Sequence, residues 1–191
     1  RDVQLTEGMM RRLSRIFAAV LLAANLNVLP APAFAGNGVP AKVTLLPDHK
    51  YYDALSGGIR RAKREIKGCF FLFKLSAGRN SLTMALADEL IAAHRRGVKV
   101  SIELEQDAMG KGSVYEQNRR AASMLMEAGV SVRFDLPRTT THVKAMVIDG
   151  RFVYLGSHNL TQSALKYNNE LSVMIDSPEL AAETLGYLDN L

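Results

Sequence analysis

The sequence predicts an α/β fold, an α/β/α sandwich in which a mixed central β-sheet is flanked by helices. Two observations carry this prediction. From residue 43 to residue 134, short apolar runs of strand length alternate with longer stretches of helical length, which is typical of strands connected through helices. Two further apolar runs then flank Asp149-Gly150, and an Asp-Gly pair in that position indicates a hairpin of antiparallel strands.

The elements are expected in a simple order. Strands and helices alternate first, as strand 43–46, helix 49–66, strand 68–75, helix 80–96, strand 98–104, helix 114–128 and strand 130–134. The hairpin strands 142–148 and 151–156 follow, and strand 170–175 and helix 179–190 end the sequence. Strands reached through helices favour parallel pairing, whereas the hairpin favours antiparallel pairing, so the expected sheet is mixed.

Length and composition indicate one domain with a proper core. The chain has 191 residues, of which 48% are hydrophobic and 23% are charged, too few for two domains of this kind. Its net charge is +5, and basic residues cluster on three expected helices. The clusters are Arg60, Arg61, Lys63, Arg64 and Lys67, then Arg95 and Arg96, then Arg119 and Arg120. Such clusters are typical of solvated helix faces, and they would also steer a polyanion.

The N-terminal region has the composition of a secretory signal peptide. Arginines at positions 11, 12 and 15 precede an apolar stretch over 16–29, and Ala33-Phe34-Ala35 follows. A basic start, a short apolar stretch and an Ala-x-Ala end predict cleavage after Ala35. Residues 1–35 are therefore expected to be an N-terminal extension and signal peptide, with an uncleaved anchor or a buried helix as the alternatives. Residues 36–191 then form a single exported domain, periplasmic or secreted.

The hairpin brings several polar residues to its open end. His142 and Lys144 are two residues apart and share one face of a strand. If the loop is the Asp-Gly pair alone, Ile148 pairs with Arg151, and counting back places Ser157 opposite His142. Asn159, two residues further on, belongs to the same end of the hairpin.

These residue types suit a phosphodiester. His142 can attack phosphorus as a neutral imidazole, and Lys144 can neutralise a phosphate oxygen. Ser157 offers a hydroxyl, Asn159 offers amide donors, and Gly156 permits close backbone approach. Taken singly, each residue is typical of an ordinary strand end or turn; taken together, they indicate catalysis.

Three further residues complete the candidate site. Glu170 opens the next strand-like run and could accept the second ring N–H of His142, fixing its tautomer. Arg138, in an expected loop, is the cation nearest to His142 in sequence and the first candidate for substrate contact. Asp149 lies at the turn, away from the open end, and is expected to be structural.

The spacing of these residues matches a known motif. The pattern His-x-Lys-x4-Asp-x6-Gly-Ser-x-Asn is fulfilled by His142, Lys144, Asp149, Gly156, Ser157 and Asn159. It resembles the HKD motif of the phospholipase D superfamily, and Glu170 sits where small single-motif members carry a glutamate. Residues 68–107 resemble the superfamily's first half, so the resemblance covers most of the chain after about Lys42. It implies the same sandwich fold over 36–191.

The resemblance also implies a mechanism. Enzymes similar to this chain use two HKD motifs in each active site, and the sequence has no second His-x-Lys. We therefore expect a homodimer in which one His142 forms a phosphohistidine while the other protonates the leaving oxygen. Two lysines would neutralise the phosphate, and no histidine or cysteine has metal-ligand spacing, so neither a metal nor another cofactor is expected.

The expected substrate is DNA or RNA, because small exported single-motif members resemble non-specific endonucleases and the basic clusters suit nucleic acid. The alternative is a phospholipase D-type enzyme acting on envelope lipids. A lipid substrate calls for an apolar rim near the cleft, and loop 105–113 offers only Met109. A binding module with an inactive site is a third class, which the complete motif disfavours.

Overall fold

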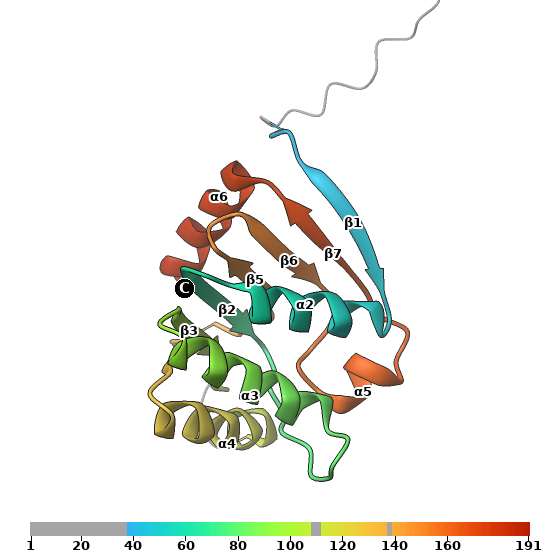
Figure 1. Cartoon of the computed structure of the whole chain (residues 1–191). Helices are drawn as coiled ribbons and strands as arrows, with labels where there is room; N and C mark the ends of the chain where they lie inside the picture. The colour runs from blue at the N-terminus through green and yellow to red at the C-terminus, as the bar shows by residue number, and fades with distance from the viewer. Residues whose placement is uncertain (1–37, 108–111, 137–138) are drawn as a thin grey trace, which may run out of the picture. The chain divides into compact units, whose positions relative to one another are not determined.

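The computed structural model describes residues 38–107, 112–136 and 139–191, and Val39–Leu191 forms one compact unit. The elements, labelled in Figure 1, are β1 Lys42–Pro47, α2 Lys50–Arg61, β2 Glu65–Phe70, α3 Leu82–Arg95, β3 Lys99–Leu104, α4 Ser113–Glu127, β4 Ser131–Phe134, β5 Lys144–Ile148, β6 Phe152–Gly156, α5 Gln162–Lys166, β7 Leu171–Asp176 and α6 Pro178–Asp189. The signal peptide predicted over 1–35 lies outside the described residues. Among the helices that are described, none has the length and apolarity needed to cross a bilayer.

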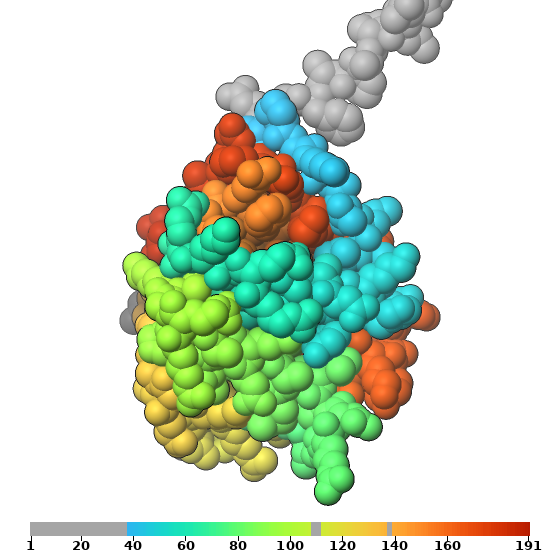
Figure 2. Space-filling model, in the orientation of Figure 1, coloured from blue at the N-terminus to red at the C-terminus, as the bar shows by residue number. Residues whose placement is uncertain are grey.

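The sheet is mixed, as predicted. Its strand order is β1-β7-β6-β5-β2-β3-β4; β2, β3 and β4 are parallel, and every other neighbouring pair is antiparallel. Helices α2, α3 and α4 pack on one face, where Leu55, Leu90 and Met146 share the main core (Figure 1). Helix α6 packs on the other face, with Ala181 against Val153. The predicted α/β/α sandwich is therefore confirmed. In Figure 2, side chains of α2 to α4 form most of the visible face.

Two predicted element boundaries are wrong. The helix predicted over 49–66 ends at Arg61, because Ala62 leaves the helical region at φ −54° and ψ 138°. The strand predicted over 68–75 is Glu65–Phe70. Pairing with the segment before β5 continues only to Phe71, whose N–H bonds the Val143 carbonyl at 2.8 Å, and the chain then moves away to lie beside residue 160.

Helix α5 was not predicted. Its five residues are too few to show a helical period, but Thr161 caps it by accepting a hydrogen bond from the Ala164 N–H at 3.1 Å. The cap occupies one of the N–H groups that a helix start leaves without an intrahelical partner. The short helix ends the segment that follows β6 and returns the chain toward β7.

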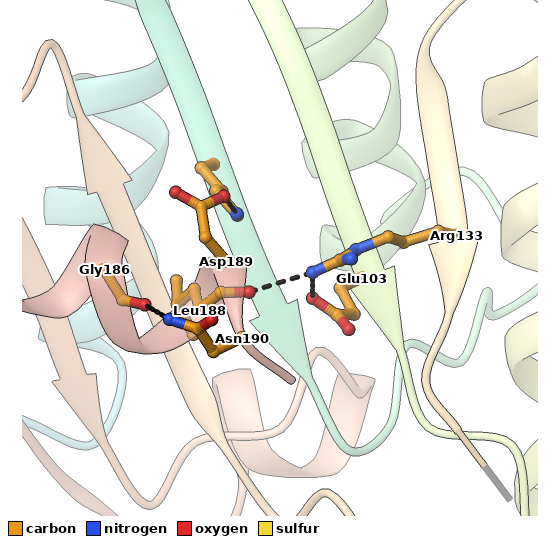
Figure 3. Close-up of polar contacts among 7 residues, drawn as sticks. Glu103, Arg133, Gly186, Leu188, Asp189 and Asn190 are labelled. Carbon is orange, nitrogen blue, oxygen red and sulfur yellow. Dashed lines mark hydrogen bonds and ion pairs between the residues drawn. The ribbon is translucent and has the colours of Figure 1, made fainter.

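Helix α6 is tied to the sheet by Arg133 of β4, as Figure 3 shows. The Arg133 guanidinium donates to Glu103 Oε2 at 2.7 Å and to the Leu188 carbonyl at 2.9 Å. Glu103 is buried, and pairing with a guanidinium offsets the cost of placing its charge there. The Asn190 side chain also donates to the Gly186 carbonyl at 2.7 Å. These contacts fix the C-terminal end of α6 next to β3 and β4.

The hairpin register differs from the prediction by one residue. Ile148 pairs with Phe152, because the loop has three residues, 149–151, where two were predicted. A shift of one residue turns every side chain of one strand to the opposite face. The predicted placement of Ser157 opposite His142 is therefore wrong.

Asp149 explains the longer loop. Its φ is +56° and that of Gly150 is +62°, so two consecutive residues adopt the left-handed region. The Asp149 carboxylate accepts hydrogen bonds from the N–H groups of Lys63, Arg64 and Glu65 at 2.7–3.2 Å. Burial alone would raise the pKa of Asp149, but these donors outweigh it and hold the pKa below the ordinary 3.8. Asp149 thus joins the hairpin to the loop between α2 and β2.

The Asp149→Asn variant should be destabilised by about 1–3 kcal/mol while keeping its activity, because it loses charge-assisted hydrogen bonds remote from the site. The pKa of Asp149 is lowered on folding, so its contribution is complete above the unfolded pKa and is lost as the pH falls through the folded pKa. Urea unfolding at several pH values should therefore show the gap between wild type and variant closing in acid. A gap that widens in acid would contradict this role.

Candidate active site

The motif residues meet at one end of three neighbouring strands. Lys144 is the first residue of β5 and pairs with Phe70 at the end of β2. Gly156 is the last residue of β6 and pairs with Ser172 of β7, two residues after Glu170. A Cβ on Gly156 would lie 2.4 Å from the Ser172 Cα. The motif glycine is therefore required where β6 approaches β7.

His142 and Lys144 form a contacting pair. The Lys144 ammonium lies 3.1 Å from His142 Nδ1 and donates to the His142 carbonyl at 2.9 Å. The Phe71 ring supports both, with 4.6 Å between the two ring centroids and 5.1 Å from Lys144 Nζ to the Phe71 centroid. Lys144 is buried and His142 is exposed. Within the described residues His142 Nε2 has no hydrogen bond, so it is the ring nitrogen open to a substrate.

Burial lowers the pKa of Lys144, and the nearby negative charge of Glu170 partly opposes that effect. Glu170 therefore lies close enough to influence Lys144 electrostatically. The two residues approach from different strands, Lys144 from the start of β5 and Glu170 from the residue before β7. A cation that contacts His142 and a carboxylate thus lie at the same end of the sheet.

Glu170 does not bond the His142 ring, in contrast to the prediction. Its Oε2 accepts the Ser157 hydroxyl, and its Oε1 accepts the Asn168 amide at 3.0 Å. Ser157 Oγ in turn accepts the Leu171 N–H at 3.1 Å. The one-residue shift of the hairpin is the cause, because it turns Ser157 toward Glu170 and away from His142. Ser157 thus holds Glu170 in place.

Asn159 carries an unsatisfied polar atom. Its side chain is half-buried, and its Oδ1 is fully buried with no hydrogen-bond partner among the residues that the structure describes. A buried polar atom without a partner costs roughly 1–3 kcal/mol. Such atoms call for an explanation, and binding of a substrate is one. Asn159 Oδ1 is an acceptor, so a hydrogen-bond donor, and not a phosphate oxygen, would satisfy it.

His158 is a site residue that the sequence analysis missed. It is fully buried and stacks on Tyr51, with ring centroids 4.3 Å apart and planes at 12°. Its Nε2 lies 2.9 Å from the Asp48 carbonyl and its Nδ1 lies 2.7 Å from the Ser172 hydroxyl. A carbonyl only accepts, so Nε2 is protonated and Nδ1 accepts from Ser172. Burial lowers the pKa of His158, which keeps this ring neutral and unavailable for acid–base work.

Asp48 forms hydrogen bonds with both His158 and Glu170 and so connects the two residues. Its carboxylate accepts the Glu170 N–H at 3.0 Å, and its own N–H donates to the Glu170 carbonyl at 2.9 Å. Asp48 has a φ of +50°, so it forms the corner between β1 and α2. The only signal for this arrangement in the sequence was the histidine inside the motif, between Ser157 and Asn159.

The segment before His142 is held by a buried carboxyl pair. Glu105 Oε2 accepts the Thr141 N–H, and Asn118 binds the Glu105 carbonyl at 2.8 Å and the Phe71 carbonyl at 2.9 Å. Burial raises the pKa of Glu105 to about 7, with a contribution from a hydrogen bond to the Asp135 carboxyl. Two carboxyl groups this close share a proton. Glu105 thus fixes the backbone from which the His142 side chain projects.

The Glu105→Gln variant should gain stability relative to wild type as the pH rises. The folded state raises the pKa of Glu105 from 4.5 to about 7, so it favours the protonated form, which glutamine mimics. As the pH rises from 4.5 to about 7, the free energy of unfolding of wild type therefore falls by about 2–3 kcal/mol. That of the variant does not fall for this reason. Melting temperatures at about pH 5 and about pH 8 measure the difference. The opposite trend would contradict a protonated Glu105.

The first two predicted basic clusters lie away from the site. Arg64 precedes β2, and Arg95 ends α3 just before β3. Both therefore lie at the end of the strands where Glu65 pairs with Lys99. Lys144 pairs at the opposite end of β2. Several cluster members are engaged elsewhere, such as Lys67 in an ion pair with Asp189. Arg138, the cation predicted to contact substrate, lies outside the described residues.

An apolar groove of about 450 Å³ runs beside His142 and Lys144 between the sheet and α6. Its lining includes Ala145, Leu155, Leu180, Tyr187 and Leu188. Leu155 is 43% exposed and Tyr187 is 57% exposed. Met109, the apolar residue noted in the sequence, lies outside the described residues. The site is therefore apolar on its α6 side, which the sequence analysis did not foresee.

The described residues contain no group of three or more histidine, cysteine, aspartate and glutamate side chains placed to hold a metal ion. Cys69, the single cysteine, is buried in β2. The cation that the described part of the site offers to a phosphate is thus the Lys144 ammonium.

The comparisons with known proteins agree with this geometry. The family described as "Cardiolipin synthase, PLD-like domain" matches residues 55–191. A mitochondrial cardiolipin hydrolase from Chlamydomonas reinhardtii is 28% identical over 188 residues, covering 90% of this chain and 81% of that protein. A phospholipase D from Rickettsia conorii is 36% identical over 101 residues, covering 53% and 46% of the two chains. The chain spans about half the length of the vertebrate and rickettsial relatives that it matches.

Solved structures share the fold. The phospholipase D family member Nuc from Salmonella typhimurium aligns with a TM-score of 0.66 at 23% identity, covering 79% of this chain and 93% of that one. At this level of identity the similarity concerns the fold alone. It shows that this fold also occurs in a protein of nearly the same extent as the described domain.

Proposed function

This chain belongs to the phospholipase D superfamily, and on that premise we propose that it is a metal-independent phosphodiesterase that hydrolyses DNA and RNA. The observation that carries the proposal is the contact between exposed His142 and buried Lys144, with His142 Nε2 open to a substrate. A nucleophile and a cation then converge where a phosphate would bind.

The reaction proceeds in two displacements. His142 attacks phosphorus through Nε2 from the tautomer that holds the ring proton on Nδ1, while the Lys144 ammonium donates to the His142 carbonyl and to the phosphate. An N–P bond forms, and the bond to the leaving oxygen breaks as that oxygen takes a proton from an imidazolium. Water then attacks phosphorus of the phosphohistidine and gives its proton to the second imidazole, the one that protonated the leaving oxygen. The N–P bond breaks and frees His142. Lys144 and Asn159 bind the non-bridging oxygens in both steps. One imidazole must start neutral and the other protonated, so the two titrate as a coupled pair.

The second imidazole comes from a second copy of the chain. The sequence has four histidines. His158 is buried with both nitrogens engaged, and His94 is close to Gly129 at the end of the sheet away from the site. Within the described residues, His49 makes no side-chain hydrogen bond or ring contact with the site. A homodimer with two His142 rings facing each other supplies the missing acid.

An exposed apolar face beside the site supports this homodimer. Leu45, Leu155 and Leu171 are 64%, 43% and 57% exposed, and the strand register places all three on the α6 side of the sheet. Single exposed apolar residues are ordinary, but a group next to a groove marks an interaction surface. We propose that a second copy covers this face and brings its His142 to the shared centre.

Nucleic acid is favoured as substrate by the charges at this end of the molecule. Lys74, Arg79 and Lys166 are exposed and lie on the segments next to residue 160, which follows the motif asparagine. Cations near a scissile phosphodiester bind the flanking phosphates of a polyanion.

The second candidate is a phospholipase D-type enzyme acting on envelope phospholipids. The apolar groove beside His142 favours it, because acyl chains would find Leu155, Leu180 and Tyr187 there. The names of the curated relatives, cardiolipin hydrolase and phospholipase D, point the same way. Export to the periplasm or medium, where such lipids are reached, remains our proposal from residues 1–35.

One experiment separates these functions. The protein is incubated with plasmid DNA, single-stranded RNA and cardiolipin vesicles, each with excess EDTA. Our proposal expects nucleic acid to be cleaved despite the chelator. Cleavage of cardiolipin alone would establish the second candidate. Loss of activity in EDTA with recovery on adding a divalent ion would contradict metal independence, and no cleavage of any substrate would indicate a binding module with an inactive site.

A further inference from the structure

A second, polar pocket of about 410 Å³ lies next to the candidate site. Its walls are the loop before α3 and helix α5, which lie side by side at the lower edge of the molecule in Figure 1. The walls are joined by the Gln162 side chain, whose Oε1 accepts the Leu82 N–H at 2.8 Å and whose amide donates to the Asn80 carbonyl at 3.4 Å. The pocket is thus a defined hollow between two connected segments.

The lining of this pocket suits a polyanion. It carries the cations Arg79 and Lys166, several hydroxyl and amide groups, and no carboxylate. The Tyr167 ring is 70% exposed, and Lys166 Nζ lies 5.2 Å from its centroid. An exposed aromatic ring beside cations is the combination with which proteins stack a nucleobase and hold its phosphate.

Helix α5, one wall of the pocket, is connected at both ends to residues of the candidate site. Gln162 is three residues after Asn159, the residue with the unsatisfied buried oxygen. At the other end of α5, Tyr167 precedes Asn168, whose amide donates to Glu170 at 3.0 Å. Lys166 and Tyr167 therefore lie on a segment that connects with the candidate site at both ends, and Gln162 joins this segment to the loop that carries Arg79.

We infer that this pocket binds the nucleotide flanking the scissile phosphodiester of a single-stranded nucleic acid. Arg79 and Lys166 hold the neighbouring phosphate, and Tyr167 stacks on an unpaired base. A duplex keeps its bases stacked inside the helix, so only a single strand offers a free base face. The inference rests on the proposed nuclease function and names its preferred substrate. Acyl chains suit the apolar groove on the α6 side, not this polar pocket.

The test compares two substrates. A single-stranded DNA oligonucleotide reaches both the catalytic centre and the pocket, whereas bis(p-nitrophenyl) phosphate is a lone diester with no flanking nucleotide. The Arg79→Ala/Lys166→Ala double variant should lower kcat/KM for the oligonucleotide relative to that for the diester. Its affinity for the oligonucleotide should also depend less on salt, with the log–log slope reduced by about 0.7 for the one phosphate contact that is lost.

The aromatic residue has its own comparison. Tyr167→Ala should weaken binding of the single strand by at least about fivefold, while Tyr167→Phe retains the stacking ring and stays near wild type. For the loss of Arg79 the matched control is Arg95→Ala, since Arg95 is an exposed arginine at the other end of the sheet. All the pocket side chains to be changed are exposed, so melting temperatures should stay close to that of wild type.

Three results would overturn the inference. The pocket variants could behave like Arg95→Ala on the oligonucleotide, they could lose duplex and single strand equally, or they could lose only cardiolipin hydrolysis. If wild type fails to hydrolyse both the diester and the oligonucleotide, the proposed function falls by itself. Fluorescence anisotropy with a labelled oligonucleotide then still tests the pocket, because equal binding by wild type and the double variant would contradict it.

Discussion

The His142→Ala variant should lose at least about four orders of magnitude in kcat and keep its fold. Removal of a covalent nucleophile typically costs this much or more, and here it also removes the proton donor, because both roles fall to copies of one residue. His142 is exposed and sits outside the strands, so its loss leaves the core intact. Turnover of a chromogenic diester and a thermal melt measure the two effects.

The matched control for this variant is His94→Ala, which also removes one histidine but lies at the other end of the sheet, close to Gly129. It should retain wild-type turnover. Activity of His142→Ala within tenfold of wild type would contradict the proposed mechanism, because no phosphohistidine could form at that position.

The Lys144→Met variant should lower kcat about 10²–10³-fold, the cost of removing one group that stabilises charge in the transition state. Methionine keeps an apolar stem against Phe71, so the change tests the ammonium and not the packing. The burial of Lys144 argues that its charge serves the reaction, since a lysine needed only for stability would be exposed. A chromogenic diester assay over a range of concentrations separates kcat from KM.

The conservative variant Lys144→Arg is the control, because it restores the charge with a different shape. It should recover part of the activity lost in Lys144→Met. A methionine variant with unchanged kcat would show that another cation neutralises the phosphate, and Arg138 would then be the first residue to examine.

The fold could be predicted from the sequence because local pattern and tertiary structure agree over most of the chain. Alternating apolar runs gave the order of strands and helices, and Asp149-Gly150 gave the hairpin. The errors arose where distant contacts decide a boundary. The loop register depends on the Asp149 carboxylate binding N–H groups of residues 63–65. Nothing near the turn in sequence carries that information.

The candidate site was only partly visible in the sequence for the same reason. The contact between His142 and Lys144 follows from two residues on one strand face. The placement of Glu170 depends on Asp48 and His158, which bond across more than one hundred residues of sequence. Such contacts leave no periodic pattern in the sequence. His158 occupies a position where the motif accepts any residue, so nothing in the sequence marks it as buried or important. The apolar groove was missed because α6 and β6 meet only in the folded chain.

The central claim is that two chains share one catalytic centre. The most direct measurement mixes wild-type and His142→Ala chains, unfolds and refolds them together, and records activity against the wild-type fraction. A mixed dimer lacks either the nucleophile or the acid, so activity should follow the square of that fraction, about one quarter at an even mixture. Size-exclusion chromatography verifies that both chains refold into dimers, and an affinity tag on the His142→Ala chain alone measures the fraction of mixed dimers. A linear dependence, with about one half of the activity at an even mixture, would contradict the claim and place the acid within the same chain, with His49 the first candidate.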